Sequence, residues 1–180
     1  MHRPQASLYT LNAAAYGLAF HLDHYKGVRR VGHNGGIQGY DSRFYMDPDH
    51  GIAVIMFYNR AFQFAAHAEA IVNRIFDCLL DLPETVPPLA ALPDEPDRWP
   101  DYSGQYLSNF TGLVELSQTA GQLELAWHEQ RIPLQRVGEK LYAGLLADRR
   151  VVSVGFIPEA QGAVQYVVLQ GAACRRIEPA

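Results

Sequence analysis

The residues best suited to chemistry lie in one short stretch, GHNGGIQGY, at positions 32–40. It places His33 and Asn34 among four glycines. Histidine changes its charge near neutral pH and can move a proton, and an amide can hydrogen-bond a substrate. Glycine lets a ligand or another backbone approach closely. The stretch is therefore the first candidate for a site.

Two kinds of site do not fit this spacing. A phosphate cradle needs G-x-x-x-x-G-K-[ST], or G-x-G-x-x-G opening a helix, and neither is present. A metal site would combine His33 with His21 and His24, but residues three apart on a strand point to opposite faces. No third ligand stands at a suitable spacing, so we predict no metal and no cofactor. A structural interpretation stays open, in which Gly35, Gly36 and Gly39 form a bulge and a tight connection.

The surrounding sequence resembles a known family. Three consecutive features are similar to the closing portion of the serine β-lactamase and penicillin-binding-protein family, on its class C and D-aminopeptidase/esterase side. They are YGLAF at 16–20, GHNGGIQGYDSRFYMDPDHGIAVIMFYN at 32–59 and a following amphipathic helix. The resemblance covers roughly residues 8–82. In that family the third signature is K-T-G or H-x-G, on the sheet strand that borders the active site. His33-Asn34-Gly35 matches the H-x-G form.

The resemblance implies a role for each residue of the motif. Gly35 leaves room for a substrate along the strand edge, and the backbone N–H of Gly36 is one of two donors to the oxyanion. His33 stands where other members have lysine and assists a proton relay or holds a substrate carboxylate. Asn34 offers its amide to the substrate. The expected rim contacts to the substrate come from Gln38 and Tyr40.

The rest of the catalytic set is missing from the sequence. No serine is followed three residues later by lysine, so the S-x-x-K nucleophile motif is absent, as are Y-x-N and S-x-N. Ser42 is close to the motif but has no identifiable acid partner. We therefore expect the C-terminal fragment of a bacterial serine hydrolase, acting by acyl transfer on a small-molecule amide or ester and inactive alone. Its expected partner is the missing N-terminal part of the catalytic domain or a second copy of the chain.

Strand polarity gives an independent reason to expect such a partner. Residues 52–58 are all apolar or aromatic, which predicts a strand buried on both faces of its sheet. The amphipathic helix predicted over 63–82 can cover only one face. Leaving three or four of these side chains uncovered would lose roughly 5 to 12 kcal/mol of burial free energy. This loss is comparable to the ~5 to 15 kcal/mol stability of a domain. Another layer should cover the second face.

The predicted fold class is α+β, in two parts. Residues 1–83 should form four antiparallel strands and a C-terminal helix, as a partial β-lactamase-like domain. Residues 84–98 form a linker, because six prolines fall within residues 82–100. Residues 99–180 alternate apolar and polar in about eight short strands, which predicts a small antiparallel barrel. That barrel resembles the lipocalin-like domain appended to some family members, and its tyrosines and Trp127 could line a cavity or form its core.

Composition narrows the remaining function classes. A formal net charge of −4 without clustered Lys and Arg argues against nucleic-acid binding. We predict no membrane segment and find no signal peptide in this chain, which leaves a periplasmic or a cytoplasmic location open. Two other functions also stay open: a non-catalytic ligand- or partner-binding barrel module, and a structural fragment that associates with itself to form an oligomer.

Overall fold

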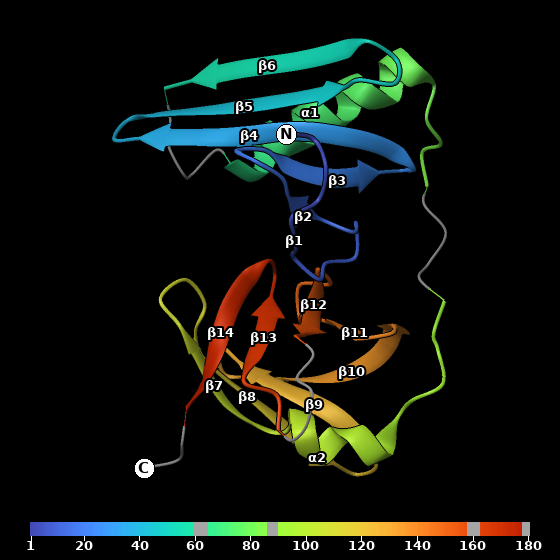
Figure 1. Cartoon of the computed structure of the whole chain (residues 1–180), viewed down its shortest axis with the longest axis vertical. Coiled ribbons are helices and arrows are strands. Elements are labelled where there is room, and N and C mark those ends of the chain that lie inside the picture. Colours follow the sequence, from blue (N-terminus) through green and yellow to red (C-terminus); the bar gives the residue numbers. More distant parts are fainter. Residues whose placement is uncertain (60–64, 86–89, 158–162, 178–180) are drawn as a thin grey trace. The chain divides into compact units, whose positions relative to one another are not determined.

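The computed structural model describes residues 1–59, 65–85, 90–157 and 163–177. The chain divides into two compact units, one of Met1–Ser7 with Asn12–Pro88 and the other of Leu8–Leu11 with Leu89–Ala180. The first is an antiparallel sheet with a helix on one face, and the second is a closed antiparallel barrel (Figure 1). The predicted α+β fold class is confirmed. No described helix is long and apolar enough to cross a membrane.

The sheet of the first unit has six strands in sequence order, each antiparallel to the next. These are β1 (Ala6–Ser7), β2 (Ala15–Tyr16), β3 (His21–Tyr25), β4 (Val28–Ile37), β5 (Tyr40–Asp47) and β6 (Ile52–Tyr58).

The structure has six strands where four were predicted, because a turn splits the first predicted strand, residues 14–23, into β2 and β3, and because the short strand β1 is added. The N–H of Gly17 donates to the Phe20 carbonyl at 2.8 Å, and Ala19 has a left-handed φ of 65°. This turn separates β2 from β3. The short strand β1 then pairs with β2 at the edge of the sheet.

Helix α1 (Ala65–Leu80) covers one face of the sheet (Figure 1). Its buried Val72 and Phe76 pack against Tyr45 of β5 and Val54 of β6. The predicted helix over 63–82 matches this element, except that residues 63 and 64 lie outside the described part of the chain. The periodic apolar positions of α1 therefore supply the cover for one side of the sheet.

A buried arginine joins the sheet to the helix. Arg30 donates to both carboxylate oxygens of Asp23, at 2.8 and 2.7 Å, and to the side chain of Asn73 on α1 at 2.6 Å. Its guanidinium lies 4.8 Å from the ring centroid of Tyr25 and 4.5 Å from that of Tyr45. Both charged groups are almost fully buried, so each depends on the other for compensation.

The opposite face of the sheet is bare at β6. Ile55 is 60% exposed and Phe57 is 80% exposed, whereas Val54, on the helix side, is 7% exposed. The prediction that residues 52–58 are buried on both faces is therefore wrong for this chain. Alternate residues of a strand point to opposite faces, and the helix reaches one set only.

The second unit is the expected eight-stranded barrel. A short 3-10 turn, η1 (Pro96–Arg98), and helix α2 (Trp99–Tyr102) precede it, so η1 begins inside the stretch predicted as a linker. The barrel closes by pairing its last strand with its first. Its strands are β7 (Gly104–Ser108), β8 (Gly112–Thr119), β9 (Gln122–Trp127), β10 (Gln130–Gly138), β11 (Leu141–Leu145), β12 (Val151–Phe156), β13 (Tyr166–Leu169) and β14 (Ala172–Ile177).

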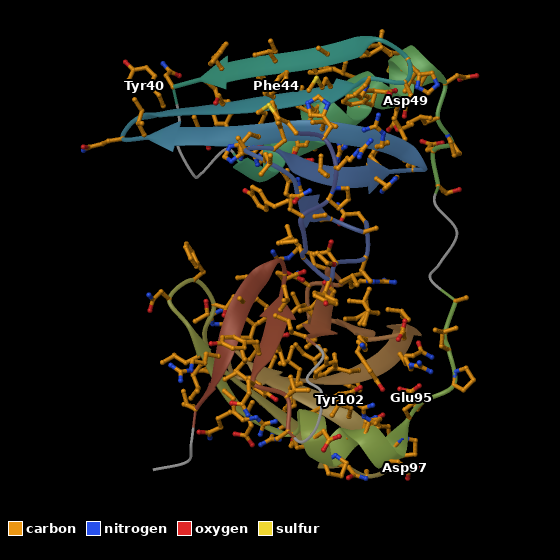
Figure 2. The ribbon with its side chains drawn as sticks, in the orientation of Figure 1. Tyr40, Phe44, Asp49, Glu95, Asp97 and Tyr102 are labelled. Carbon is orange, nitrogen blue, oxygen red and sulfur yellow. The ribbon has the colours of Figure 1, made fainter. Side chains whose placement is uncertain are left out.

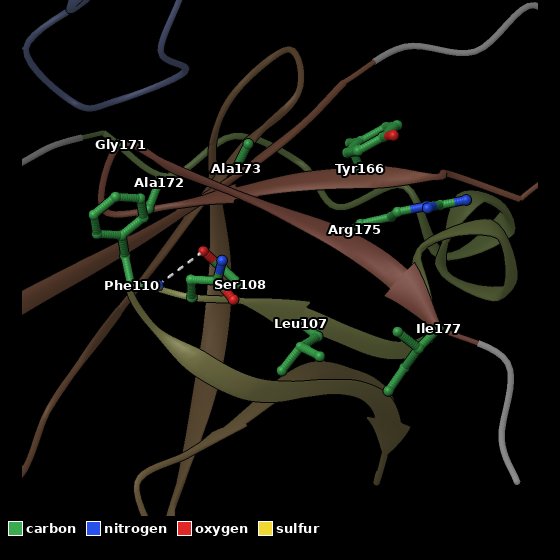
Figure 3. A pocket seen from close by; sticks show the side chains of 10 residues that line it. Leu107, Ser108, Phe110, Tyr166, Gly171, Ala172, Ala173, Arg175 and Ile177 are labelled. Carbon is green, nitrogen blue, oxygen red and sulfur yellow. Dashed lines mark hydrogen bonds between the residues drawn. The ribbon is translucent and has the colours of Figure 1, made fainter.

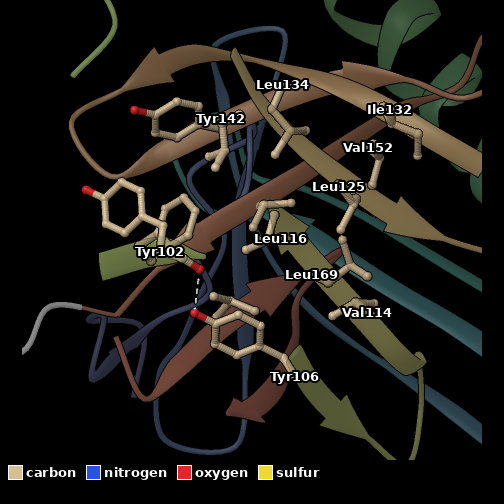
Figure 4. Packing of buried hydrophobic residues seen from close by; sticks show 14 of the residues in the cluster. Tyr102, Tyr106, Val114, Leu116, Leu125, Ile132, Leu134, Tyr142, Val152 and Leu169 are labelled. Atoms are coloured by element: carbon tan, nitrogen blue, oxygen red, sulfur yellow. Dashed lines mark hydrogen bonds between the residues drawn. The ribbon is translucent and has the colours of Figure 1, made fainter. Parts of the chain in front are cut away.

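Side chains fill the barrel interior (Figure 4). The Tyr102 ring stacks on Phe156 with ring centroids 3.8 Å apart, and the Tyr106 hydroxyl donates to the Tyr102 carbonyl at 2.7 Å. Tyr106 and Tyr142 are fully buried. Of the two interpretations left open for the barrel tyrosines, the structure favours core.

Candidate functional site

The candidate motif lies where β4 runs past its neighbour. β4 pairs with β5 as far as Ile37, but with β3 only as far as Gly32. Among the described residues, the segment from His33 to Ile37 therefore has strand β5 on one side and no partner strand on the other. The motif residues His33, Asn34, Gly35 and Gly36 are all exposed along this open edge.

Residues 33–36 form regular strand rather than a loop. Their pairing with β5 is continuous, so the alternative prediction of a glycine bulge at Gly35 and Gly36 is wrong. The reversal comes later, at Gln38 and Gly39, and Gly39 takes the left-handed φ of 85°. Tyr40, which begins β5, is exposed at this end of the sheet, and Asp49 marks the other end (Figure 2).

The ladder fixes which backbone groups face the open edge. Ile37 and Tyr40 close a two-residue hairpin, and such closing residues exchange hydrogen bonds. Alternate residues then bond to β5, which directs the N–H groups of Asn34 and Gly36 the other way. Gly36 is thus placed to donate outward from the edge, as an oxyanion donor must.

The register also aligns the motif with the bare face. His33 is paired with Phe44, which is paired with Ile55; the next row on that face joins Gly35 to Ser42 and Ser42 to Phe57. The helix lies on the opposite face, where Tyr45 packs. His33 and Gly35 consequently share one face with the exposed apolar side chains of β6.

The imidazole of His33 is held in one tautomer. Its Nδ1 lies 2.6 Å from the carbonyl oxygen of Asn34. A carbonyl can only accept, so Nδ1 carries the hydrogen and donates it. In neutral His33 the lone pair is then on Nε2. The ring of Tyr16 stands edge-on to His33, with centroids 6.1 Å apart.

Ser42 is close to the motif but does not pair with its histidine. The Ser42 hydroxyl donates to the Gly35 carbonyl at 3.4 Å, and a β-carbon on Gly35 would lie 2.8 Å from that hydroxyl oxygen. Within the described residues, no hydrogen bond joins Ser42 to His33. A side chain at Gly35 would therefore displace the Ser42 hydroxyl.

Sequence inspection missed the charged pair beneath this edge. Asp41 and Arg43 are both buried, and Arg43 donates to Asp41 at 2.7 Å. They face Gly36 and Asn34 across the ladder. Their i, i+2 spacing was the available signal, because residues two apart on a strand share a face.

No metal cluster accompanies the motif. Among residues 1–59, 65–85, 90–157 and 163–177, no three His, Cys, Asp or Glu side chains are grouped to hold a metal ion. The site consists of backbone donors, one histidine, one amide and an apolar sheet face. This set can bind a polar substrate along the strand edge and stabilise negative charge on an oxygen.

Comparisons with known proteins show which sequences and folds are similar to this chain. Residues 4–75 match the model of the family described as Beta-lactamase. The crystal structure of SurE with D-Leu has a TM-score of 0.67 and 20% identity, over 98% of this chain and 42% of that one. The crystal structure of SurE gives the same score and identity, over 98% and 40%.

A third solved structure is less similar to this chain. The octameric penicillin-binding protein homologue from Pyrococcus abyssi has a TM-score of 0.41 and 16% identity, over 97% of this chain and 40% of that one. The chain therefore spans about two fifths of the length of each of these solved structures. No curated protein matches the sequence.

Proposed function

We propose that this chain, whose residues 4–75 match the β-lactamase family model, supplies one wall of a serine hydrolase active site. The hydrolase acts by acyl transfer on a small-molecule amide or ester. One observation supports this most strongly: His33 and Gly35, at the open edge of β4, lie on the same face of the sheet as the exposed Ile55 and Phe57, with only strand β5 between them. A segment packed on this face would therefore reach both the open edge of β4 and the exposed side chains of β6.

Each motif residue has a task in this proposal. The Gly36 N–H donates to the oxygen that becomes negative when the substrate carbonyl is attacked, a contribution of about 2.7 to 4 kcal/mol. Neutral His33 presents Nε2 as an acceptor for the nucleophile's proton, and protonated His33 binds a substrate carboxylate. Gly35 keeps the strand edge accessible, and Asn34 hydrogen-bonds the substrate. Rim contacts come from Gln38 and Tyr40.

The nucleophile comes from another segment. Because the sequence holds no S-x-x-K, the serine and its lysine lie on another segment, an N-terminal part of the catalytic domain that packs against the bare face. A second copy of the chain would cover that face but would bring no S-x-x-K. The chain alone is inactive on this proposal. Covering Ile55 and Phe57 would contribute about 1.5 to 3 kcal/mol for each side chain fully buried, which favours such assembly.

Complementation tests the proposal. The chain is mixed with an N-terminal segment of a β-lactamase-family hydrolase that carries S-x-x-K, and hydrolysis of nitrocefin and p-nitrophenyl acetate is followed. Neither part alone should turn over substrate, and the mixture should. Serine to alanine in S-x-x-K should abolish the recovered activity.

Two variants of the chain make the test specific to the motif. His33→Ala should lower the recovered activity by roughly 10²-fold or more, the scale of general acid–base catalysis. His24→Ala removes an exposed histidine from the neighbouring strand β3 and should leave activity unchanged. A mixture that neither associates nor hydrolyses, with a monomeric chain, would contradict the proposal.

A further inference from the structure

A second candidate site lies on the outer surface of the barrel. An open hollow of about 620 Å³ is formed where β7, β13 and β14 meet the turn after β7 (Figure 3). Its volume is in the range of small-molecule sites. The lining includes Leu107, Phe110, Tyr166, Arg175 and Ile177.

Strand register assembles the floor of this hollow. Tyr166 of β13 is paired with Arg175 of β14, and Arg175 is paired with Leu107 of β7. All three side chains point outward, because the residue next to each of them is buried in the barrel core: Val167, Cys174 and Tyr106. A cation is thus flanked on both neighbouring strands by an aromatic or aliphatic side chain.

The walls are apolar and unusually exposed. Phe110 is 92% exposed, Leu107 48% and Tyr166 40%. The Phe110 N–H donates to the Ser108 hydroxyl at 3.3 Å, which holds the turn that presents the phenyl ring (Figure 3). These apolar side chains line the same hollow as the guanidinium of Arg175, so a ligand placed there would contact both.

No described residue pairs with the charge of Arg175. Within the described part of the chain, its guanidinium makes no hydrogen bond or ion pair, and none of the ten lining residues is acidic. The next residue is the opposite case: Arg176 donates to the carbonyls of Asp101, Ser103 and Val164 and to the Tyr106 hydroxyl. Arg176 holds the barrel together, and Arg175 is left for a ligand.

We propose that this hollow binds an amphipathic monocarboxylate. The guanidinium of Arg175 takes the carboxylate, for which its planar fork is suited. The alkyl or aromatic body of the ligand lies over Leu107, Phe110 and Tyr166. One cation with apolar neighbours fits a single negative charge on an apolar body better than a multiply charged phosphate. This binding is independent of any acyl transfer at the β4 edge.

Binding to the full chain tests the proposal with three probes. Octanoate carries both features, acetate the charge alone and 1-octanol the apolar body alone. Titration followed by ¹H–¹⁵N NMR should give shift changes at β7, β13 and β14 with octanoate. Acetate and 1-octanol should bind at least about tenfold more weakly, because each lacks one half of the recognition.

A matched pair of variants isolates the guanidinium. Arg175→Gln should weaken octanoate binding about tenfold, the effect of losing one charged hydrogen-bonding partner. Arg149→Gln removes the same charge from an exposed residue of the same unit and outside the hollow, and should change nothing. Any of three results would overturn the proposal: equal octanoate affinities in the two variants, shift changes outside β7, β13 and β14, or octanoate binding no tighter than that of 1-octanol.

Discussion

Gly35 and Ser42 face each other across the β4–β5 ladder, and the Ser42 hydroxyl fills the space that a side chain at Gly35 would need. A β-carbon there would be 2.8 Å from the hydroxyl oxygen. The H-x-G motif is therefore constrained by local packing even without a substrate. This relationship gives the first prediction.

Gly35→Ala should be coupled to Ser42. In the parent chain the new methyl group forces the hydroxyl to rotate and breaks its 3.4 Å bond to the Gly35 carbonyl. In a Ser42→Ala background that conflict is absent. A double-mutant cycle by urea denaturation should give an interaction energy of about 0.5 kcal/mol or more. Additive effects would mean that the two side chains do not meet.

Arg30 should be far more important for stability than its neighbour Arg29. Arg30→Met leaves the buried Asp23 carboxylate without its ion pair, at a cost of about 3 to 5 kcal/mol. Arg29→Met removes an exposed pair with Asp49 and should cost about 1 kcal/mol or less. Urea denaturation compares the two.

A rescue variant separates charge from packing at this position. Asp23→Asn combined with Arg30→Met removes both buried charges and should recover part of the lost stability. Arg30→Lys keeps the charge but not the fork, so it should still be destabilising because Asp23 and Asn73 are bonded by different nitrogens. An Arg30→Lys variant as stable as the parent chain would contradict the bidentate geometry of Arg30 and Asp23.

The contrast between the two units shows what the sequence could predict. The barrel strands followed from period-2 alternation, as in Leu123 and Leu125, which are buried, against Glu124 between them. Polarity alone could not separate strand from turn in the glycine-rich stretch. There, the regular ladder to β5 continues through Gly35 and Gly36 because cross-strand hydrogen bonds need no side chain.

Contacts that depend on strand register were the hardest to predict from the sequence. The Lys26–Gly27 turn places Asp23 opposite Arg30, so their symmetric spacing about that turn was a usable signal. The alignment of His33 with Phe44 and Ile55 depends on two successive hairpins, each of which must be in the correct register. A slip of one residue would have moved every side chain to the other face.

Acid should destabilise the first unit through His21. Burial lowers the pKa of His21, with an opposing effect from Asp23 and a further lowering from Arg30. His21 then binds a proton more readily in the unfolded chain than in the folded one. The contribution of neutral His21 to the free energy of unfolding is therefore complete above pH ~6.5 and is lost as the pH falls through the pKa of His21 in the folded chain. His21→Gln should reduce the loss of stability between pH 7 and pH 5. His24→Gln, at an exposed position, should behave like the parent chain.

Polar substitution should cost much more stability at Val54 than at its neighbour Ile55 in β6, because only one face of the sheet is covered. Val54→Ser places a hydroxyl under α1, where the side chain is 7% exposed, and should cost about 2 to 3 kcal/mol. Ile55→Ser changes a side chain that is 60% exposed and should cost under about 1 kcal/mol in dilute solution. Urea denaturation over a range of protein concentrations checks both. An equally large cost at Ile55 in the dilute limit would mean that this face is covered within a single chain, and the site for an added nucleophile segment would then be lost.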